Sequence, residues 1–319
     1  TNIIGTSFYD RKGSKKVYLN KKRERMRDYS LLPSPYLSGT FENLFKKYDY
    51  SWTLTWETNR GCPFKCTFCD WGSAIASKLE KFEEERLYKE IDYFSKKKID
   101  LVFGADSNFG ILKRDIKLAE KLAANKKKFG YPNRFTVCYT KNSTEKVFDL
   151  AKIFAEVGMH RGVSVSMQSL NTNTLKNIKR DNIKLDFFKS LQRKYVEADM
   201  VTYTELILPL PGETYESWKE GIDKLLDSSQ HSGLIVYNAN VMPNAELGDK
   251  NYQEKYKIKT AKIPLFQAHS DKPADDILEY EPIIVGTETM TTSQWKKAYK
   301  FTVFLQACHY LGLLQAITI

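Results

Sequence analysis

Three cysteines lie within one short segment, Gly61-Cys62-Pro63-Phe64-Lys65-Cys66-Thr67-Phe68-Cys69, in the spacing C-x3-C-x2-C. Cysteine thiolates are the protein ligands of iron–sulfur clusters, and this spacing lets one tight loop reach three corners of a cubane. We therefore predict that Cys62, Cys66 and Cys69 hold a four-iron, four-sulfur (4Fe-4S) cluster. Three ligands leave the fourth iron without a protein ligand, so that iron can chelate a small molecule. The number of cysteines thus indicates chemistry on a bound molecule rather than electron storage.

Two other interpretations of the cysteines stay open: a structural zinc site and three unrelated buried thiols. Structural zinc normally takes four Cys or His ligands. Cys138, within a predicted strand, and Cys308, on an apolar helix face, are predicted to be small core residues. The four histidines show no ligand spacing to the three cysteines: His160, His231, His269 and His309.

The composition indicates a globular protein rather than a disordered, fibrous or membrane-spanning one. Of the 319 residues, 42% are hydrophobic and 28% are charged, and no apolar run approaches the roughly 20 residues of a membrane helix. No basic region followed by an apolar stretch opens the chain, so we expect no secretory signal. The chain has five cysteines, and three of them lie within eight residues. This pattern indicates a metal or cluster site in a reducing compartment. We therefore expect a cytoplasmic protein.

The chain is basic, with a formal charge of +11. Residues 1–50 hold 11 Lys and Arg against 5 Asp and Glu, which gives +6 of that total. Such a segment is either a solvated basic arm or a surface that attracts nucleic acid, an anionic substrate or an acidic redox partner. Charge alone does not choose among these.

The elements that must position the cysteine loop follow a repeating order from residue 51 onward. Short apolar strands alternate with longer charged helical stretches, which is typical of parallel β/α units. Strands are predicted at residues 52–57, 100–104, 134–139, 162–167, 201–208 and 234–241. Helices are predicted at residues 80–97, 115–127, 143–157, 186–198 and 215–228. Six units fall short of the eight of a full barrel, so we expect an α/β fold, an open partial (β/α)6 barrel.

Three regions are predicted along the chain. Residues 1–45 form a basic N-terminal extension or linker, in which two closely spaced prolines exclude a helix interior. Residues 46–245 form the partial barrel, with the cysteine loop leaving the C-terminal end of its first strand. Residues 246–319 form a C-terminal α/β cap that contains a strand at 280–285 and a helix at 293–314.

The cysteine loop, placed after the first strand of repeated β/α units, resembles the signature of the radical S-adenosylmethionine (SAM) superfamily. In those enzymes SAM chelates the open iron of a three-cysteine 4Fe-4S cluster. One electron from the cluster then cleaves SAM to methionine and a 5′-deoxyadenosyl radical. The resemblance implies that Phe68 lies near the adenine of SAM, a role compatible with packing the loop.

The fourth strand and the segment after it extend the resemblance. Two sets of side chains alternate along the strand: Val163, Val165 and Met167 on one face, and Ser164, Ser166 and Gln168 on the other. The run from residue 166 to 180 is similar to a segment of the oxygen-independent coproporphyrinogen oxidase-like and cobalamin-linked branches. That similarity implies that Gln168 binds the ribose of SAM and that Arg180 pairs with its carboxylate, which suits a guanidinium.

Four further residues are assigned to SAM binding by the same resemblance. Glu205, in the fifth strand, would be the second ribose ligand, and a carboxylate in an apolar strand needs a partner in any case. Met242, after the sixth strand, would offer an apolar wall to adenine. Asp106 and Asn108, after the second strand, would contact the SAM amino group, although this stretch departs from the common Gly-Gly-Glu form.

Residues 33–37, 57–61, 70–72 and 285–295 resemble most the cobalamin-binding group of radical SAM enzymes. Many of these are methyltransferases of unactivated carbon or phosphorus. Residues 1–319 hold no Asp-x-His-x-x-Gly cobalamin element, so we expect cobalamin to be held by residues before Thr1, to bind without that ligand or to be absent. The resemblance therefore leaves two activities open. One is a cobalamin-dependent methyltransferase, and the other is a radical SAM rearrangement or oxidation without cobalamin.

Other functions are disfavoured by the residues. Methylthiotransferases and peptide-modifying enzymes with auxiliary clusters need more cysteines than the two outside the loop. A basic, metal-stabilised nucleic-acid-binding protein is the remaining alternative, but the chain shows only charge and no nucleic-acid motif. We therefore expect a small-molecule or peptide substrate, no membrane, and an acidic electron donor such as flavodoxin or ferredoxin, steered by the basic N-terminal arm.

Overall fold

The computed structural model describes residues 3–24, 26, 28–71, 78–142, 145–159, 162–265 and 279–314. The chain divides into two compact units, Thr1–Pro33 and Ser34–Ile319. The smaller unit therefore ends before residue 45. The three-region division predicted from the sequence stays a prediction.

The smaller unit contains a β-hairpin, where the sequence predicts only an irregular extension. Strands β1 (Ser7–Tyr9) and β2 (Val17–Leu19) pair antiparallel, and a 3-10 helix, η1 (Tyr29–Leu31), follows. The Asp10 carboxylate accepts hydrogen bonds from the backbone N–H groups of Gly13 and Ser14, both at 2.8 Å, and so shapes the turn. Stacking of Phe8 on Tyr18 across the strands, with ring centres 5.3 Å apart, supports the register.

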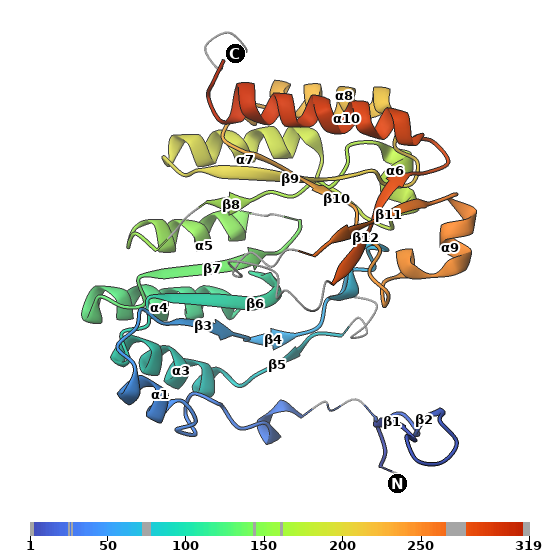
Figure 1. Cartoon of the computed structure of the whole chain (residues 1–319). Helices are drawn as coiled ribbons and strands as arrows, with labels where there is room; N and C mark the ends of the chain where they lie inside the picture. Colours follow the sequence, from blue (N-terminus) through green and yellow to red (C-terminus); the bar gives the residue numbers. More distant parts are fainter. Residues whose placement is uncertain are drawn as a thin grey trace. The chain divides into compact units, whose positions relative to one another are not determined.

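The larger unit is built on two three-stranded parallel sheets (Figure 1). The first has the order β3-β6-β7, from β3 (Thr53–Trp56), β6 (Leu101–Phe109) and β7 (Arg134–Tyr139). The second has the order β10-β9-β8, from β8 (Val163–Ser164), β9 (Thr202–Leu208) and β10 (Leu234–Asn238). The α/β class and the parallel strands are confirmed. In the described part of the chain no ladder joins β7 to β8, so closure into a partial barrel stays a prediction.

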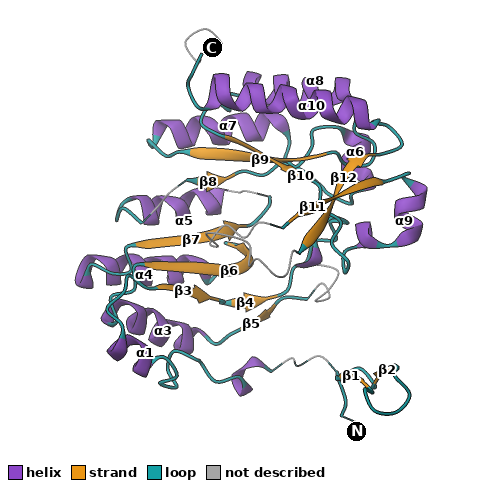
Figure 2. Ribbon diagram, viewed as in Figure 1, coloured by secondary structure: helices purple, strands orange, loops and turns teal. Residues whose placement is uncertain are grey.

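Helices alternate with these strands along the chain, as the sequence predicts (Figure 2). Their bounds are α1 (Glu42–Lys47), α3 (Glu84–Lys96), α4 (Asp115–Phe129), α5 (Glu145–Ala155), α6 (Thr172–Asn177), α7 (Leu185–Glu197) and α8 (Tyr215–Asp227). In the first sheet, Trp56 packs edge-on against Phe94 of α3, and Phe135 packs against Phe154 of α5. One face of the sheet is thus buried under helices. Thr55 and Phe103, on the other face, are exposed.

The second sheet shows the alternation predicted for its first strand. Val163, Val165 and Met167 are buried in a hydrophobic core that includes side chains of α7 and α8. Ser164 and Ser166 lie on the opposite face, with their hydroxyl oxygens 2.7 Å apart. The sheet therefore presents an apolar face to the helices, and its other face carries half-buried polar side chains.

The C-terminal part adds a hairpin and a helix. It contains η2 (Glu246–Gly248), α9 (Lys250–Lys255), antiparallel strands β11 (Lys259–Pro264) and β12 (Tyr280–Gly286), α10 (Thr292–Leu305) and a π-helix, η3 (Gln306–Tyr310). The sequence predicts β12 and the final helix but not β11 or α9. The backbone N–H of Ile284 donates to Ala239 (2.7 Å), which attaches β12 to the end of β10.

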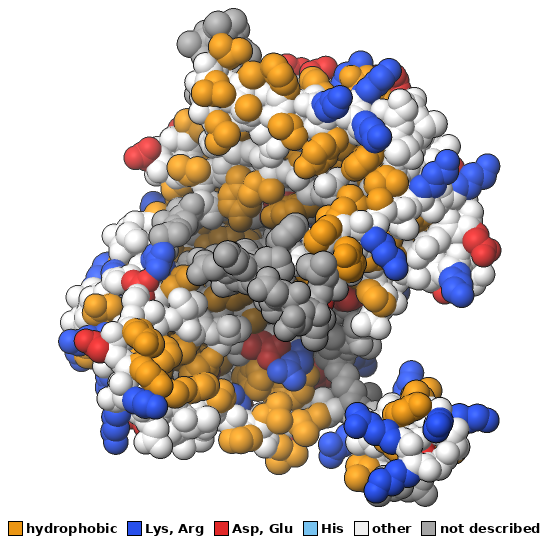
Figure 3. Space-filling model, viewed as in Figure 1, with side chains coloured by type: hydrophobic (Ala, Val, Ile, Leu, Met, Phe, Trp, Pro, Cys, Tyr) orange, Lys and Arg blue, Asp and Glu red, His pale blue; other side chains and the backbone are white. Residues whose placement is uncertain are grey.

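Helix α10 packs on α8, where the indole N–H of Trp218 donates to Thr302 at 3.0 Å. Its outward side chains Val303 and Phe304 are exposed, and Figure 3 shows hydrophobic side chains gathered over this end of the molecule. None of the helices described has the length and apolar character that crossing a bilayer requires.

Candidate iron–sulfur site

The cysteine loop begins at a short ladder that the sequence does not predict. Strands β4 (Asn59–Arg60) and β5 (Glu80–Lys81) pair antiparallel on the two sides of the loop. Asp106, at the distal part of β6, holds the β4 side: its Oδ1 accepts the backbone N–H groups of Thr58 (2.7 Å) and Asn59 (3.1 Å). Its Oδ2 accepts the Thr58 hydroxyl. Asp106 is only 2% exposed, and this burial raises its pKa to about 6.

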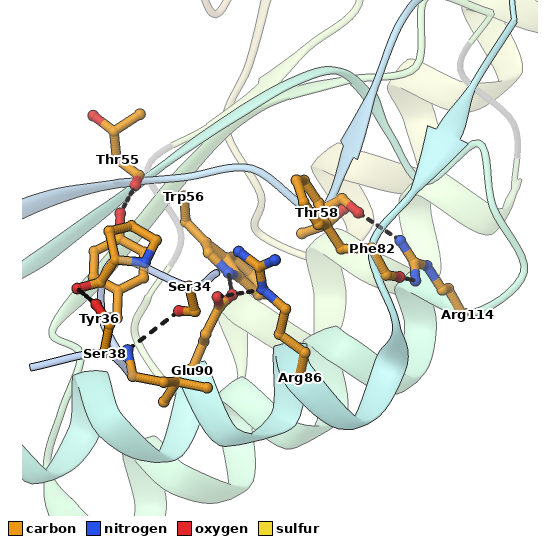
Figure 4. Close-up of polar contacts among 12 residues, drawn as sticks. Ser34, Tyr36, Ser38, Thr55, Trp56, Thr58, Phe82, Arg86, Glu90 and Arg114 are labelled. Carbon is orange, nitrogen blue, oxygen red and sulfur yellow. Dashed lines mark hydrogen bonds and ion pairs between the residues drawn. The ribbon is translucent and has the colours of Figure 1, made fainter. Parts of the chain in front are cut away.

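A buried arginine joins the two sides of that ladder. Arg114 donates to the carbonyl oxygen of Thr58 at 2.6 Å and to that of Phe82 (Figure 4). Nearby, Glu90 accepts hydrogen bonds from the indole N–H of Trp56 (2.7 Å) and from Arg86 (2.9 Å). Charge-assisted bonds to buried carbonyls are among the stronger polar contacts. The base of the loop is therefore fixed from β3, α3 and α4.

The middle of the loop is tied to segments far along the chain. The backbone N–H of Thr67 donates to Ile178 (3.0 Å), and the Thr67 carbonyl accepts from Leu247 (2.8 Å). The Thr67 hydroxyl lies 3.1 Å from that of Tyr252. A tight turn closes beside it, because the N–H of Cys69 donates to the carbonyl of Cys66 at 3.2 Å. Contacts from α6, η2 and α9 thus set the shape of the turn that carries the cysteines.

The three cysteines are reduced; Cys62 and Cys66 are buried and Cys69 is half-buried. Among the residues that the structure describes, no group of three His, Cys, Asp or Glu side chains could hold a single metal ion. A single zinc ion, with bonds of about 2.3 Å to each sulfur, needs its thiolates within roughly 4 Å of one another. A 4Fe-4S cluster places each thiolate on a different iron and so takes sulfurs that lie further apart. Three cysteine thiols from one loop are a donor set that iron–sulfur clusters take, whereas structural zinc normally takes four Cys or His ligands.

Donors and cations surround two of these sulfurs. Asn108 donates its side-chain N–H to Cys62 Sγ at 3.2 Å. Arg180 hydrogen bonds to Cys66, and Lys141 Nζ lies 3.9 Å from Cys66 Sγ. Burial lowers the pKa of Arg180, while the neighbouring Cys66 and Glu205 act in the opposite direction. An N–H donor and positive charge therefore lie beside two of the cysteine sulfurs. The sequence predicts Asn108 and Arg180 as site residues but misses Lys141, whose only signal is its position just after the third strand.

A cavity of about 810 Å³ opens beside Cys66. Arg180 and Lys141 line it together with Lys176 and apolar residues such as Met167 and Leu175. Arg180 is held in place from the side, since its Nε donates to Asn182 (2.9 Å) and its Nη2 to the carbonyl of Ser166. An anchored guanidinium in a cavity next to a cysteine thiolate can hold a carboxylate.

Glu205 occupies the polar face of the second sheet. It accepts hydrogen bonds from the hydroxyls of Ser164 (3.1 Å), Ser166 and Tyr237 (3.4 Å). Burial, followed by the charge of Glu205, raises the pKa of Tyr237. The Glu205 carboxylate therefore has the hydrogen-bond donors that a charged group in an apolar strand needs. The group is half-buried, so it can also bind hydroxyls of a ligand.

The other predicted residues are more scattered. Gln168 follows β8 and is buried, with a left-handed backbone (φ 63°) and an isolated bridge to Leu206 of β9. Its N–H donates to the carbonyl of Glu205 at 2.9 Å. The Phe68 ring packs against the apolar cluster around Ile178 and lies 5.7 Å from Lys141 Nζ. Met242 follows β10 with an exposed side chain. SAM contacts of Phe68, Asp106, Asn108, Gln168, Arg180, Glu205 and Met242 stay predictions.

The prediction that the other two cysteines are core residues is wrong. Cys138 is exposed, because it lies on the face of β7 opposite the buried Phe135. Cys308 is half-buried in the π-helix after α10. Two of the histidines, His231 and His309, contact each other at 3.1 Å near this helix.

The chain matches a known protein family and two curated sequences. The model of the radical SAM superfamily matches residues 56–225. The chain is 36% identical over 312 residues to the cobalamin-dependent radical SAM methyltransferase TokK of Streptomyces tokunonensis, covering 97% of this chain and 45% of TokK. It is 36% identical over 280 residues to the 2-(S-pantetheinyl)-carbapenam-3-carboxylate methyltransferase of Streptantibioticus cattleyicolor, covering 87% of this chain and 41% of that protein.

Two solved structures share the fold at low sequence identity. The radical SAM methyltransferase TsrM of Kitasatospora setae aligns with a TM-score of 0.54 at 18% identity, covering 70% of this chain and 42% of TsrM. Coproporphyrinogen III oxidase (HemN) of Escherichia coli aligns with a TM-score of 0.54 at 14% identity, covering 84% of this chain and 55% of HemN. The chain spans less than half the length of the two curated relatives that it matches. By the match over residues 56–225 and the three-cysteine loop within it, this chain belongs to the radical SAM superfamily of enzymes.

Proposed function

We propose that this chain is the SAM-cleaving part of a methyltransferase that acts with cobalamin on an unactivated centre. The observation that carries the proposal is the loop of Cys62, Cys66 and Cys69, because it offers three thiols in one turn and the structure places Asn108 and Lys141 beside two of their sulfurs. When bound, the cluster supplies the electron that cleaves SAM. The names of the two curated relatives support methyl transfer, and one of them supports cobalamin.

The residues of this chain would bind SAM along a path from the cluster to the second sheet. Arg180, anchored beside Cys66, would pair with the carboxylate of SAM. Glu205, which already accepts three hydroxyl hydrogen bonds, would accept those of the ribose instead of the serines. Gln168 lies next to Glu205, to whose carbonyl its backbone N–H donates, and would complete the ribose site. Phe68, packed on the loop, would contact adenine.

Cobalamin would be held by residues outside Thr1–Ile319, or would bind without the histidine of an Asp-x-His-x-x-Gly element. The second candidate is a radical SAM enzyme that works without cobalamin. In both cases the substrate would be a small molecule or peptide. An acidic flavodoxin or ferredoxin would be the electron donor, for which the basic charge of the chain is suited.

Anaerobic reconstitution with iron and sulfide tests the proposal. The protein is expected to take up about four irons and to release 5′-deoxyadenosine or S-adenosylhomocysteine from SAM under dithionite. Single replacements of Cys62, Cys66 and Cys69 by Ala should abolish both, whereas Cys138→Ala, a thiol outside the loop, should keep the cluster. Methylcobalamin formation with added hydroxocobalamin separates the two candidates. Bound zinc, with no SAM turnover, would disprove the proposal.

A further inference from the structure

We propose that Asn108 and Lys141 set the reduction potential of the cluster by acting on the sulfurs of Cys62 and Cys66. The inference rests on the proposed cluster but goes beyond SAM cleavage, because it assigns two side chains to control of electron uptake. It also gives Asn108 a different role from the SAM contact predicted from the sequence.

The orientation of Asn108 is fixed by its partners. The side chain is fully buried, and its Oδ1 accepts the backbone N–H of Lys141 at 3.4 Å. An amide whose oxygen is bound to a donor must direct its nitrogen elsewhere. The Nδ2 lies 3.2 Å from Cys62 Sγ and 3.0 Å from Ser107 Oγ, and Ser107 itself donates to the carbonyl of Gly61 at 2.7 Å. The surrounding contacts therefore hold the Asn108 side chain in place as an N–H donor to Cys62.

Lys141 acts on the second cysteine. It follows β7, and its backbone is linked to Asn108 by the hydrogen bond just described. Its Nζ lies 3.9 Å from Cys66 Sγ and 5.7 Å from the centre of the Phe68 ring. A cation held between a thiolate and an aromatic face is attracted by both. Lys141 also lines the cavity beside Cys66, so solvent reaches its surroundings.

Both groups stabilise the reduced state of the cluster more than the oxidised state. Reduction adds one electron from the donor and no proton, so the cluster and its thiolates gain one negative charge. Hydrogen bonds to the sulfurs and nearby positive charge raise the potential of such clusters. The buried amide of Asn108 is screened little by salt, whereas the charge of Lys141 beside an open cavity is screened more. The two contributions should therefore differ in their dependence on ionic strength.

The test is a redox titration of the reconstituted protein, followed by electron paramagnetic resonance without SAM. Asn108→Leu removes the donor at similar size, and Lys141→Met removes the charge but keeps the stem. Both variants should have a lower potential than the wild type, and only the Lys141→Met shift should shrink at high salt. Lys141→Arg should restore the wild-type potential. Lys152→Met, on α5, removes a lysine outside the cysteine loop and serves as the matched control.

The iron and sulfide content of each protein distinguishes failure of the proposed function from failure of this inference. If the wild type takes up no cluster, the proposed function fails and this inference fails with it. If the variants take up the cluster and keep the wild-type potential, the inference alone is overturned. Should Asn108→Leu fail to assemble a cluster, pulsed resonance on the reduced wild type decides the question. A nitrogen coupling that changes on 15N labelling of asparagine supports the hydrogen bond, and its absence refutes it.

Discussion

The two sheets of the larger unit use their polar residues in different ways. On the first sheet, Asp106 and Arg114 are buried and bind the backbone of the cysteine-loop stem. On the second, Glu205 is half-buried, and the partners that the described residues give it are hydroxyls. Under the proposed function, the first sheet would support the cluster loop and the second would bind SAM. Substitutions on the first should change stability, and those on the second should change binding.

The largest effect is expected from Asp106→Ala. It leaves the backbone N–H groups of Thr58 and Asn59 and the Thr58 hydroxyl without their acceptor inside the protein. Each unsatisfied buried group costs about 1–3 kcal/mol, so we expect a loss of roughly 3 kcal/mol or more in the free energy of unfolding. Urea denaturation measures it. Asp106→Asn can keep these contacts and should lose much less. Equal losses of unfolding free energy in the two variants would contradict the role of these hydrogen bonds in holding the base of the cysteine loop.

A pH dependence of stability should come from the same carboxyl group. Burial raises the pKa of Asp106 from 3.8 to about 6 in the folded state, so the folded protein binds the proton more tightly than the unfolded chain. The stabilising contribution of the protonated group is complete below about pH 4 and is lost as pH rises through 6. At 1.36 kcal/mol per pKa unit, the loss is about 3 kcal/mol. The difference in unfolding free energy between wild type and Asp106→Asn should follow this curve. A flat difference from pH 4 to 7 would contradict it.

The smallest effect on folding is expected from Glu205→Gln on the second sheet. Its half-buried position and hydroxyl partners suggest a change of less than about 1 kcal/mol in stability. Affinity for SAM, measured by isothermal titration calorimetry on the cluster-loaded protein, should fall about tenfold, because a charge-assisted bond to the ribose is weakened. Glu216→Gln, on α8, is the control. If Glu205→Gln lost much stability and kept its SAM affinity, Glu205 would be a structural residue rather than a SAM ligand.

The sequence predicted the features that depend on neighbouring residues alone. Six strands, the helices between them and the alternation of Val163 with Ser164 all follow from periodicity, and the structure has them. The contacts that hold the cysteine loop did not follow, because Arg114 and Asp106 reach Thr58 across about 50 residues. Asp106 and Asn108 were expected at the SAM amino group, which stays a prediction, and no spacing rule shows that they also contact the cysteine loop. Cys138 was misplaced because a strand pattern alone does not say which face meets solvent.

Thr67 stands between the second and third cysteines, yet its backbone is completed by Ile178 and Leu247. During synthesis on the ribosome, the cysteines emerge long before these partners. The loop therefore reaches its final shape only after η2 has been made and packed. A cofactor that needs the finished loop would therefore load only once Leu247 has been made, and until then reducing surroundings would protect the thiols.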